Sequence, residues 1–302
     1  MIADRLERSM LFVPAARRPM IEKAVAVAAD AVCLDLEDSV PLEEKPAARN
    51  TAIRALQELD FGDRTRILRI NGLDTPFAYR DLIEVVEAAG DRIDLIMLPK
   101  AGSREDVAFV DRLLSQIEMH REFGRPIGIE AQIETASGFM AVAEIAQASP
   151  RLEALIFGPG DYSASMQMPS EFIGEVDARW QPAMHAIVAA ARASGLRCVD
   201  GPYAAYKDTE GFDHACRIAR SMGFDGKQCI HPGQLLTANR VFTPAREEAA
   251  KAEEIVKAYE EAAAQGRGSA SFNGRMIDAA NLRMARVILR KYQLSRSREA
   301  GG

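Results

Sequence analysis

Two acidic residues, Glu134 and Asp161, each follow a short apolar run, at 127–133 and 154–157. If these runs are neighbouring strands, the two carboxylates lie about 5 Å apart, which suits one shared metal ion. With no histidine or cysteine nearby, the pair favours a hard divalent cation, Mg²⁺ with Mn²⁺ as the alternative. In the competing interpretation, Glu134 pairs with Arg69 and Asp161 caps a helix.

A second acidic group, Asp35-Leu36-Glu37-Asp38, ends the apolar run that begins at residue 31. Strand alternation places Asp35 and Glu37 on one face, so Glu37 and Asp38 are candidate catalytic residues beside Asp35. Asp38 or Ser39 would alternatively cap the following helix. Arg69, at the end of the next run, could hold a carboxylate in bidentate fashion or stabilise an oxyanion, and a surface salt bridge is the alternative.

Further candidates for ligand contact lie at the ends of other apolar runs. Gly158, Pro159 and Gly160 precede Asp161 and would let a ligand approach the backbone closely. Lys100 could contact an anion, although we favour a solvent-facing lysine. His231 could be catalytic, although we favour a structural role.

Short β-rich runs alternate with longer amphipathic segments eight times along the chain. The predicted strands are 10–14, 31–36, 66–70, 95–99, 127–133, 154–157, 196–199 and 226–230. The predicted helices are 19–29, 43–58, 76–89, 104–123, 137–148, 177–194, 208–221 and 232–242. This order predicts a TIM (β/α)8 barrel, whose active site lies at the C-terminal ends of the strands. An open doubly wound sheet ranks second, because no Gly-x-Gly-x-x-Gly turn follows an early strand.

The composition changes after Pro244, so we expect a barrel domain over 1–243 and a C-terminal helical extension over 244–302. An Ala-, Glu- and Lys-rich stretch runs to residue 265. A Gly- and Ser-rich loop follows at 266–274 and is predicted to act as a hinge. An amphipathic helix is expected from about residue 278 to 292.

Charge and composition exclude several classes of protein. The net charge of −6 argues against binding nucleic acid or an anionic membrane, and no apolar run is long enough to span a bilayer. The N-terminus does not resemble a signal peptide, so we expect a cytoplasmic protein. The four cysteines are irregularly spaced, which predicts buried thiols, and the four histidines give little support for a zinc site.

Taken together, these motifs resemble the citrate lyase β-subunit-like or HpcH/HpaI aldolase family, especially its malyl-CoA and citramalyl-CoA lyases. The resemblance covers most of the chain and is most specific over residues 34–40. It rests on segments 8–14, 29–40, 69–71, 98–100, 133–135, 157–161 and 223–232.

The resemblance implies that Glu134 and Asp161 bind magnesium and that Arg69 holds the carboxylate and oxygen of a 2-oxo acid. It also implies that Phe12, Arg17 and Lys23 line a coenzyme A groove. In CoA lyases of this family, a C-terminal lid from the neighbouring subunit supplies an aspartate acid, and residues 274–278 look like that motif. Asp278 is therefore the candidate acid, although an N-cap is its alternative role. A lid shared between subunits implies at least a dimer, and the resemblance suggests a homotrimer or a hexamer.

The expected activity is a magnesium-dependent carbon–carbon lyase that cleaves a 3-hydroxyacyl-CoA, such as malyl-CoA or citramalyl-CoA, into acetyl-CoA and a 2-oxo acid. The alternatives are a malyl-CoA thioesterase and a citrate lyase β-type subunit acting on a carrier-bound citryl thioester. An aldolase on a free hydroxy-oxo acid is disfavoured, because relatives of that type commonly use a histidine base and no histidine precedes His120.

Overall fold

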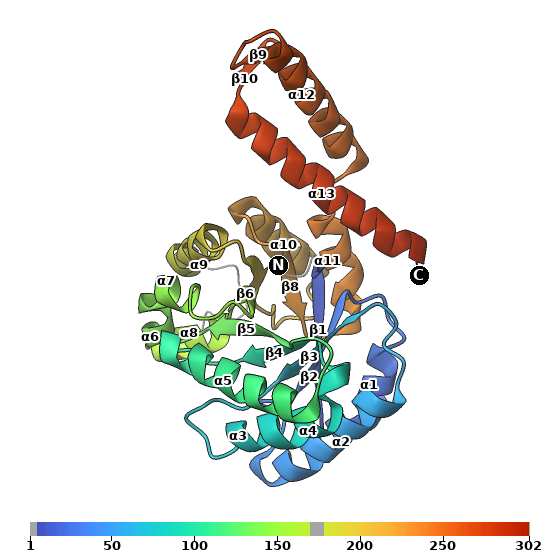
Figure 1. Cartoon of the computed structure of the whole chain (residues 1–302), viewed down its shortest axis with the longest axis vertical. Coiled ribbons are helices and arrows are strands. Elements are labelled where there is room, and N and C mark those ends of the chain that lie inside the picture. The colour runs from blue at the N-terminus through green and yellow to red at the C-terminus, as the bar shows by residue number, and fades with distance from the viewer. Residues whose placement is uncertain (1–4, 170–177, 302) are drawn as a thin grey trace. The chain divides into compact units, whose positions relative to one another are not determined.

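The computed structural model describes residues 5–169 and 178–301, which form two compact units, Met1–Asn239 and Arg240–Gly302 (Figure 1). The division falls after Asn239, whereas the composition placed it after residue 243. Asp177, the predicted start of one helix, lies outside the described residues. Among the described residues, no helix is both long and apolar enough to cross a membrane.

The first unit is the predicted barrel of eight parallel strands, with β8 paired to β1 to close the sheet. The strands are β1 (Ser9–Pro14), β2 (Ala31–Asp35), β3 (Thr65–Arg69), β4 (Leu95–Leu98), β5 (Gly128–Ile133), β6 (Leu152–Phe157), β7 (Arg197–Asp200) and β8 (Gly226–Cys229). Neighbouring strands in the sequence are neighbours in the sheet. The open doubly wound alternative is therefore wrong.

The barrel interior is packed with apolar side chains. Met10, Cys33, Ile67, Met97 and Ile156 belong to one buried cluster, with Phe12 packed against it. Most strands are buried on both faces, which is why strands such as β1, β4 and β6 appear in the sequence as short, largely apolar runs. All four cysteines are free and buried, as predicted.

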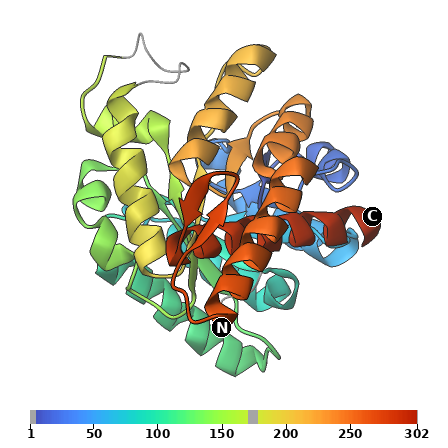
Figure 2. The ribbon, with the colours of Figure 1, turned by 90° about the horizontal axis from the view of Figure 1, so that it is seen from above.

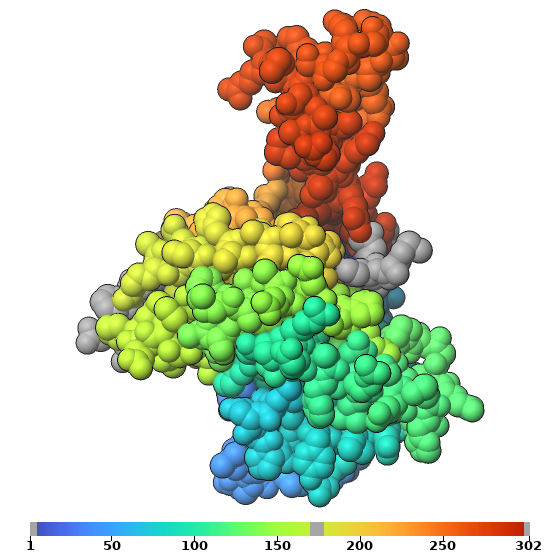
Figure 3. Space-filling view, turned by 60° about the vertical axis from the view of Figure 1, so that its left-hand side comes forward, coloured from blue at the N-terminus to red at the C-terminus, as the bar shows by residue number. Residues whose placement is uncertain are grey.

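Helices surround the strands and cover their outer faces (Figures 1 and 2). Figure 3 shows one face of the molecular surface, coloured by position along the chain. They are α1 (Arg18–Ala24), α2 (Lys45–Glu58), α3 (Ala78–Arg80), α4 (Glu87–Ala89), α5 (Arg104–Arg121), α6 (Ala136–Met140), α7 (Val142–Ile145), α8 (Pro159–Ser165), α9 (Gln181–Ala193), α10 (Thr209–Met222) and α11 (Leu235–Phe242). Short 3₁₀ turns at 42–44, 90–92, 178–180 and 232–234 complete this layer.

Three predicted helices differ from the observed ones. The helix expected over 19–29 ends at Ala24, where the β-branched Val25 and Val27 lower helix propensity. The helix expected over 76–89 contains a π-helical segment, Asp81–Val86, between α3 and α4. The helix expected over 137–148 divides into α6 and α7, because Ala141 leaves the helical conformation.

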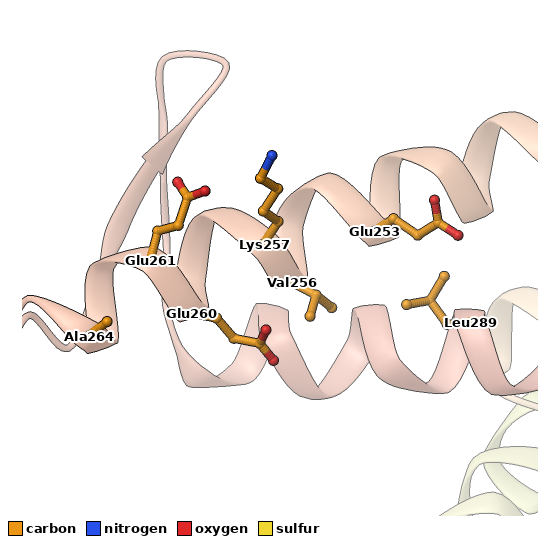
Figure 4. Close-up of a pocket in the computed structure, with 7 residues that line it drawn as sticks. All are labelled: Glu253, Val256, Lys257, Glu260, Glu261, Ala264 and Leu289. Atoms are coloured by element: carbon orange, nitrogen blue, oxygen red, sulfur yellow. The ribbon is translucent and has the colours of Figure 1, made fainter.

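The second unit is a helical hairpin with a small β-hairpin at its turn. It comprises α12 (Arg246–Ala264), β9 (Ala270–Phe272), β10 (Arg275–Ile277) and α13 (Ala279–Gly301). The expected hinge loop at 266–274 therefore contains β9, which pairs antiparallel with β10. Val256 of α12 and Leu289 of α13 line a shallow pocket between the two helices (Figure 4).

Candidate active site

The C-terminal ends of β2 to β6 bring five charged residues to one end of the barrel. Asp35 and Arg69 are the last residues of β2 and β3, Glu134 directly follows β5, and Lys100 lies two residues after the end of β4. Asp161 lies in the first turn of α8, after β6. Because the strands are parallel, their carboxyl ends share one rim, and the sequence-predicted residues meet there.

Arg69 is buried and holds two carboxylates. Its Nε and Nη2 atoms donate to the two oxygens of Asp35 at 2.7 Å each, and its Nη1 lies 3.0 Å from Glu37 Oε2. The Arg69 guanidinium also lies over the Phe12 ring, 4.9 Å from its centroid. The surface salt-bridge interpretation of Arg69 is therefore wrong. A bidentate guanidinium with a fixed orientation is suited to binding a carboxylate or an oxyanion.

Burial and neighbouring charges have opposite effects on the pKa values of Asp35 and Glu37. Burial alone would raise the pKa of Asp35, but the Arg69 guanidinium holds it below its ordinary value. Glu37 is different, because burial raises its pKa despite the opposing effects of Arg69 and Lys100. Asp35 also accepts hydrogen bonds from the Glu37 and Ser39 amides. Asp35 is thus the structural support of Arg69, and Glu37 is the carboxylate with the less stabilised charge.

Neither Asp38 nor Ser39 caps a helix. The following 3₁₀ turn has Pro41 at its N-cap, and the next helix, α2, has Glu44 there. Asp38 is instead 59% exposed, with Oδ2 lying 3.6 Å from Lys100 Nζ. Asp38 therefore belongs to the site, at its open edge.

Lys100 corrects the sequence-based interpretation, which favoured a solvent-facing lysine. Its ammonium hydrogen-bonds Glu37 and lies 3.6 Å from Asp161 Oδ1, and its side chain is 27% exposed. Its backbone N–H donates to Glu134 Oε1 at 2.8 Å. The direction of the Lys100 side chain depends on the turn after β4, and hydrophobic periodicity does not predict the conformation of a turn.

Glu134 is buried, with 1% of the residue exposed. The Lys100 amide binds one carboxylate oxygen and the Gln132 side-chain amide binds the other. A Cβ at Gly158 would lie 2.3 Å from Glu134 Oε2, so only glycine leaves room for this carboxylate. Burial, with repulsion from Glu37 and Asp161, raises the pKa of Glu134 to about 8. Glu134 does not pair with Arg69, contrary to the competing interpretation.

Asp161 is positioned by α8, a short helix that the sequence analysis missed. The N-cap of α8 is Gly158 and Pro159 opens the first turn, so Asp161 is not the cap. Proline at this position is favourable because its missing N–H would have no partner there. The Asp161 side chain is 41% exposed, in contrast to the buried Glu134. The exposed Gly160 has open space where a Cβ would lie.

The site carries more negative than positive charge. In the described part of the chain, the carboxylates are Asp35, Glu37, Asp38, Glu134 and Asp161, and the interacting cations are Lys45, Arg69 and Lys100. When all five carboxyl groups are ionised, as metal binding would favour, they exceed the three cations by two negative charges. A divalent cation would neutralise that excess, and oxygen ligands are those that Mg²⁺ prefers.

The residues present fit a magnesium ion of low protein coordination. No three histidine, cysteine or acidic side chains of the described residues surround one metal position. Glu134 and Asp161 would supply two ligands, and Mg²⁺ commonly keeps several coordination positions for water and substrate. Glu134 is already oriented by two hydrogen bonds, which is how ligands around metal sites are commonly fixed.

Two residues of the site were not identified from the sequence. Gln132 lies two positions before Glu134, so strand alternation places it on the same face, and this signal was present. Lys45 is buried in α2, and its ammonium donates to the Leu36 and Glu37 carbonyl oxygens at 2.7 Å each. Nothing local in the sequence distinguishes this lysine from a solvent-facing helical one.

The predicted coenzyme A contacts lie around β1 and α1. Phe12 is partly buried beneath Arg69. Arg17 is exposed and pairs with Glu44, its Nη1 lying 2.8 Å from Glu44 Oε2. Lys23 is exposed in the last turn of α1. Two cations on one exposed segment are compatible with phosphate binding, but Arg17 would have to exchange Glu44 for a ligand.

Asp278 and His231 both cap helical turns. Asp278, in the second unit, accepts hydrogen bonds from the Ala280 and Asn281 amides at the start of α13. His231 Nδ1 accepts from the Gly233 amide at 3.0 Å, and its ring stacks on Tyr206. These contacts agree with the structural role favoured for His231. Asp278 is exposed, so its capping contacts leave its candidate role as an acid open to test.

Comparisons with known proteins agree with this geometry. The HpcH/HpaI aldolase/citrate lyase family model matches residues 8–232, which include all eight strands. An L-malyl-CoA/beta-methylmalyl-CoA lyase of Cereibacter sphaeroides is 43% identical over 304 aligned residues, with 96% of each chain covered. A (3S)-malyl-CoA thioesterase of the same species is 38% identical, with 94% of each chain covered.

A solved structure extends the likeness to three dimensions. The CitE protein of Mycobacterium tuberculosis, solved in complex with magnesium, acetoacetate and coenzyme A, is 32% identical and matches with a TM-score of 0.77. The match covers 94% of this chain and 97% of that one. The barrel, the acidic rim and the sequence matches lead to one conclusion: the chain belongs to the HpcH/HpaI aldolase/citrate lyase family.

Proposed function

We propose that this protein is a magnesium-dependent carbon–carbon lyase that cleaves a 3-hydroxyacyl-CoA of the malyl-CoA or citramalyl-CoA type. The products are acetyl-CoA and a 2-oxo acid. The strongest structural support is the rim where Arg69 and five carboxylates converge with an excess of negative charge. The 43% identity to a malyl-CoA lyase over nearly the whole chain favours this substrate class.

The reaction breaks the bond between the thioester α-carbon and the carbon bearing the hydroxyl. The hydroxyl passes its proton to a carboxylate of the rim, for which Glu37 is the proposed acceptor, and becomes the carbonyl of the oxo acid. The bonding electrons form a thioester enolate. Glu134 and Asp161 would hold the magnesium ion, which, when bound, polarises substrate oxygens as a Lewis acid. Arg69, fixed by Asp35, would bind the oxo-acid carboxylate and stabilise charge on the adjacent oxygen.

Asp278 is the proposed acid that protonates the enolate carbon, which completes acetyl-CoA. Its place in the second unit agrees with a lid supplied by a neighbouring subunit, and we propose a homotrimer or a hexamer of this chain. Phe12, Arg17 and Lys23 are the proposed coenzyme A contacts, because an aromatic ring of β1 and two exposed cations of the segment that follows it suit a base and its phosphates. Four free thiols agree with a cytoplasmic location, which is also proposed.

The test is an assay of the purified chain on malyl-CoA, citramalyl-CoA and citryl-CoA, with and without Mg²⁺, following the thioester and the oxo acid together. Equal, magnesium-dependent release of acetyl-CoA and oxo acid is expected. Free coenzyme A with an intact hydroxy acid would instead identify a thioesterase, the activity named for the 38% identical relative. No turnover of any thioester by the chain alone would favour a carrier-dependent citrate lyase subunit.

Asp278→Asn tests the proposed acid with little effect on the fold. Asparagine caps helices about as well as aspartate, so α13 should keep its N-terminus. Lyase turnover should fall by about a hundredfold, while α-proton exchange with solvent should slow in parallel. Full turnover by this variant would remove Asp278 from the mechanism. Size-exclusion chromatography with light scattering tests the proposed oligomer.

A further inference from the structure

Lys100 contacts more acidic residues of the rim than any other lysine of the site, and no role has yet been assigned to its side chain. Its ammonium hydrogen-bonds Glu37 and lies 3.6 Å from both Asp38 Oδ2 and Asp161 Oδ1. Its backbone N–H binds Glu134 Oε1. One residue therefore contacts four carboxylates that arrive from three different strand ends.

The backbone at Lys100 indicates that its side chain matters at this position. Lys100 has a φ of 50°, in the left-handed region that disfavours residues with a Cβ, while Gly102, two residues later, does not adopt a positive φ. A turn after β4 that needed only this conformation would be easier to form with glycine. Such strained residues gather at functional sites because the surrounding contacts maintain them.

The Lys100 ammonium carries its charge at neutral pH. Burial alone would lower the pKa of Lys100, but its hydrogen bond to Glu37 and the charges of Glu37, Glu134 and Asp161 raise it above the ordinary value. A permanent positive charge thus lies beside Asp161, one of the two proposed metal ligands. Like charges in a partly buried site repel strongly, so this ammonium opposes the arrival of a divalent cation.

We propose that Lys100 is a built-in counter-cation that competes with the divalent metal for Asp161 and so sets the metal affinity of the site. The inference rests on the proposed function, because it takes Glu134 and Asp161 as the metal ligands. Without metal, the ammonium holds Glu37, Asp38 and Asp161 together and prevents their mutual repulsion. When metal binds, the ammonium gives up Asp161 and keeps Glu37, to which it is already hydrogen-bonded.

The backbone and the side chain of Lys100 contact different carboxylates. Glu134 is held by the main chain of Lys100, so replacing the side chain leaves the Glu134 hydrogen bond in place. The contacts to Glu37, Asp38 and Asp161 belong to the side chain alone. A substitution at residue 100 therefore removes the counter-charge without removing the amide that orients Glu134.

The experiment measures Mn²⁺ binding to the purified, chelator-treated full chain by electron paramagnetic resonance of the free ion, without substrate. The variants are Lys100→Met, which removes the charge, Lys100→Gln, which keeps a hydrogen-bond donor for Glu37, and Lys100→Arg, which keeps the charge. Lys207→Met is the matched control, because Lys207 is an exposed lysine of the loop after β7, on the same end of the barrel. Thermal melting confirms that each variant is folded, and Lys100→Gln carries the test if Lys100→Met does not fold.

The two charge-removing variants should bind Mn²⁺ at least about tenfold more tightly than the wild type. Lys100→Arg and Lys207→Met should bind it close to wild-type affinity. Unchanged or weaker binding by both Lys100→Met and Lys100→Gln, with a wild type that binds Mn²⁺, would overturn the counter-cation role and leave the proposed lyase intact. A wild type that binds no Mn²⁺ would overturn the proposed metal site and this inference with it.

Discussion

The two ends of the barrel both contain buried acidic residues, but only one end has as many cationic groups as carboxyl groups. At the N-terminal end, one connected network of the described residues joins four carboxyl groups to four guanidinium groups. They are Glu7, Asp94, Glu130 and Glu153, with Arg5, Arg66, Arg125 and Arg197. Arg197 alone lies 2.9 Å from Glu7 and 3.0 Å from Glu153.

At the C-terminal end, five carboxylates face three cations, and Glu134 has a pKa raised to about 8. The same residue types therefore serve different purposes at the two ends. A balanced, buried network fixes the barrel, because losing one partner leaves an uncompensated charge. An unbalanced one retains electrostatic free energy that a bound cation can release. The difference predicts that substitutions at the two ends affect different properties.

Glu134→Gln should have the largest effect on activity. Loss of a metal-ligating carboxylate is expected to lower kcat roughly a thousandfold in saturating Mg²⁺. Stability in a chelating buffer should change little, because the neutral amide removes the repulsion from Glu37 and Asp161 but can accept only one of the two hydrogen bonds that Glu134 accepts. Steady-state kinetics and thermal melting measure both, with Glu105→Gln on the exposed start of α5 as the control. Near wild-type kcat would contradict the assignment of this end as catalytic.

Arg197→Met should lower stability and leave activity intact, the opposite of Glu134→Gln. Removing this guanidinium leaves Glu7, Glu130 and Glu153 without their shared partner, and should cost about 3–5 kcal/mol in the free energy of unfolding. The kcat of the folded fraction should stay near that of the wild type. Urea denaturation measures the loss, and Arg217→Met, which breaks an exposed helical pair, should change stability by less than about 1 kcal/mol. A large fall in kcat would mean that the two ends are not separable.

Arg69→Lys should produce a smaller loss of activity than Glu134→Gln. Lysine keeps the charge but cannot donate in bidentate fashion to Asp35 while also holding Glu37. We expect kcat/KM for the thioester to fall by about a hundredfold, in the range for losing one donor to a developing negative charge. Mn²⁺ affinity should change much less, since Arg69 is not a proposed ligand. If Mn²⁺ affinity fell by as large a factor as kcat/KM, Arg69 would have a role in metal binding instead.

Glu130→Gln should have the smallest effect of these substitutions. It should change only the free energy of unfolding, by an amount that depends on pH. Burial raises the pKa of Glu130 well above its ordinary value, with repulsion from Glu7 adding and Arg197 opposing. The native state thus retains a proton that the unfolded chain loses above about pH 4.3, so this group lowers stability as pH rises from there.

The Glu130→Gln variant should therefore be more stable than the wild type at pH 8, by about 1–3 kcal/mol, with the difference shrinking as pH falls toward 4.5. Urea midpoints across this pH range provide the measurement, and kcat should be unchanged. A variant less stable than the wild type at pH 8 would mean that Glu130 is ionised and compensated by Arg197.

Local patterns predicted most of the elements but not their irregular ends. Most of the strands were identified because they are short, largely apolar runs buried on both faces. The strand β8 is an exception, because Lys227 and Gln228 interrupt its run. The helix α8 was missed because its residues, Pro159–Ser165, lack an amphipathic period, and its start depends on proline after a glycine cap. The hairpin of β9 and β10 was missed because each strand has three residues, too few for alternation to be visible.

The site residues divide in the same way. Glu134 and Asp161 were predictable, since each follows a strand and parallel strands end on one rim. Lys100 was misjudged, because its direction depends on a left-handed turn that neither its side chain nor its neighbours specify. Arg17 was expected to be available for phosphate, but an ion pair with Glu44, 27 residues away in the chain, engages it.

The sequence by itself determined the order of strands and helices, and hence which residues share the catalytic rim. Periodicity, turn residues and apolar runs act over a few neighbouring positions, so they can be recognised without the fold. Only the tertiary structure decided which carboxylate meets which cation. Asp35 and Arg69 are 34 residues apart, and Glu37 and Lys100 are 63 apart. The parallel pairing of β2 with β3 places Asp35 beside Arg69, and the left-handed turn at Lys100 directs its ammonium to Glu37. No local pattern encodes either contact.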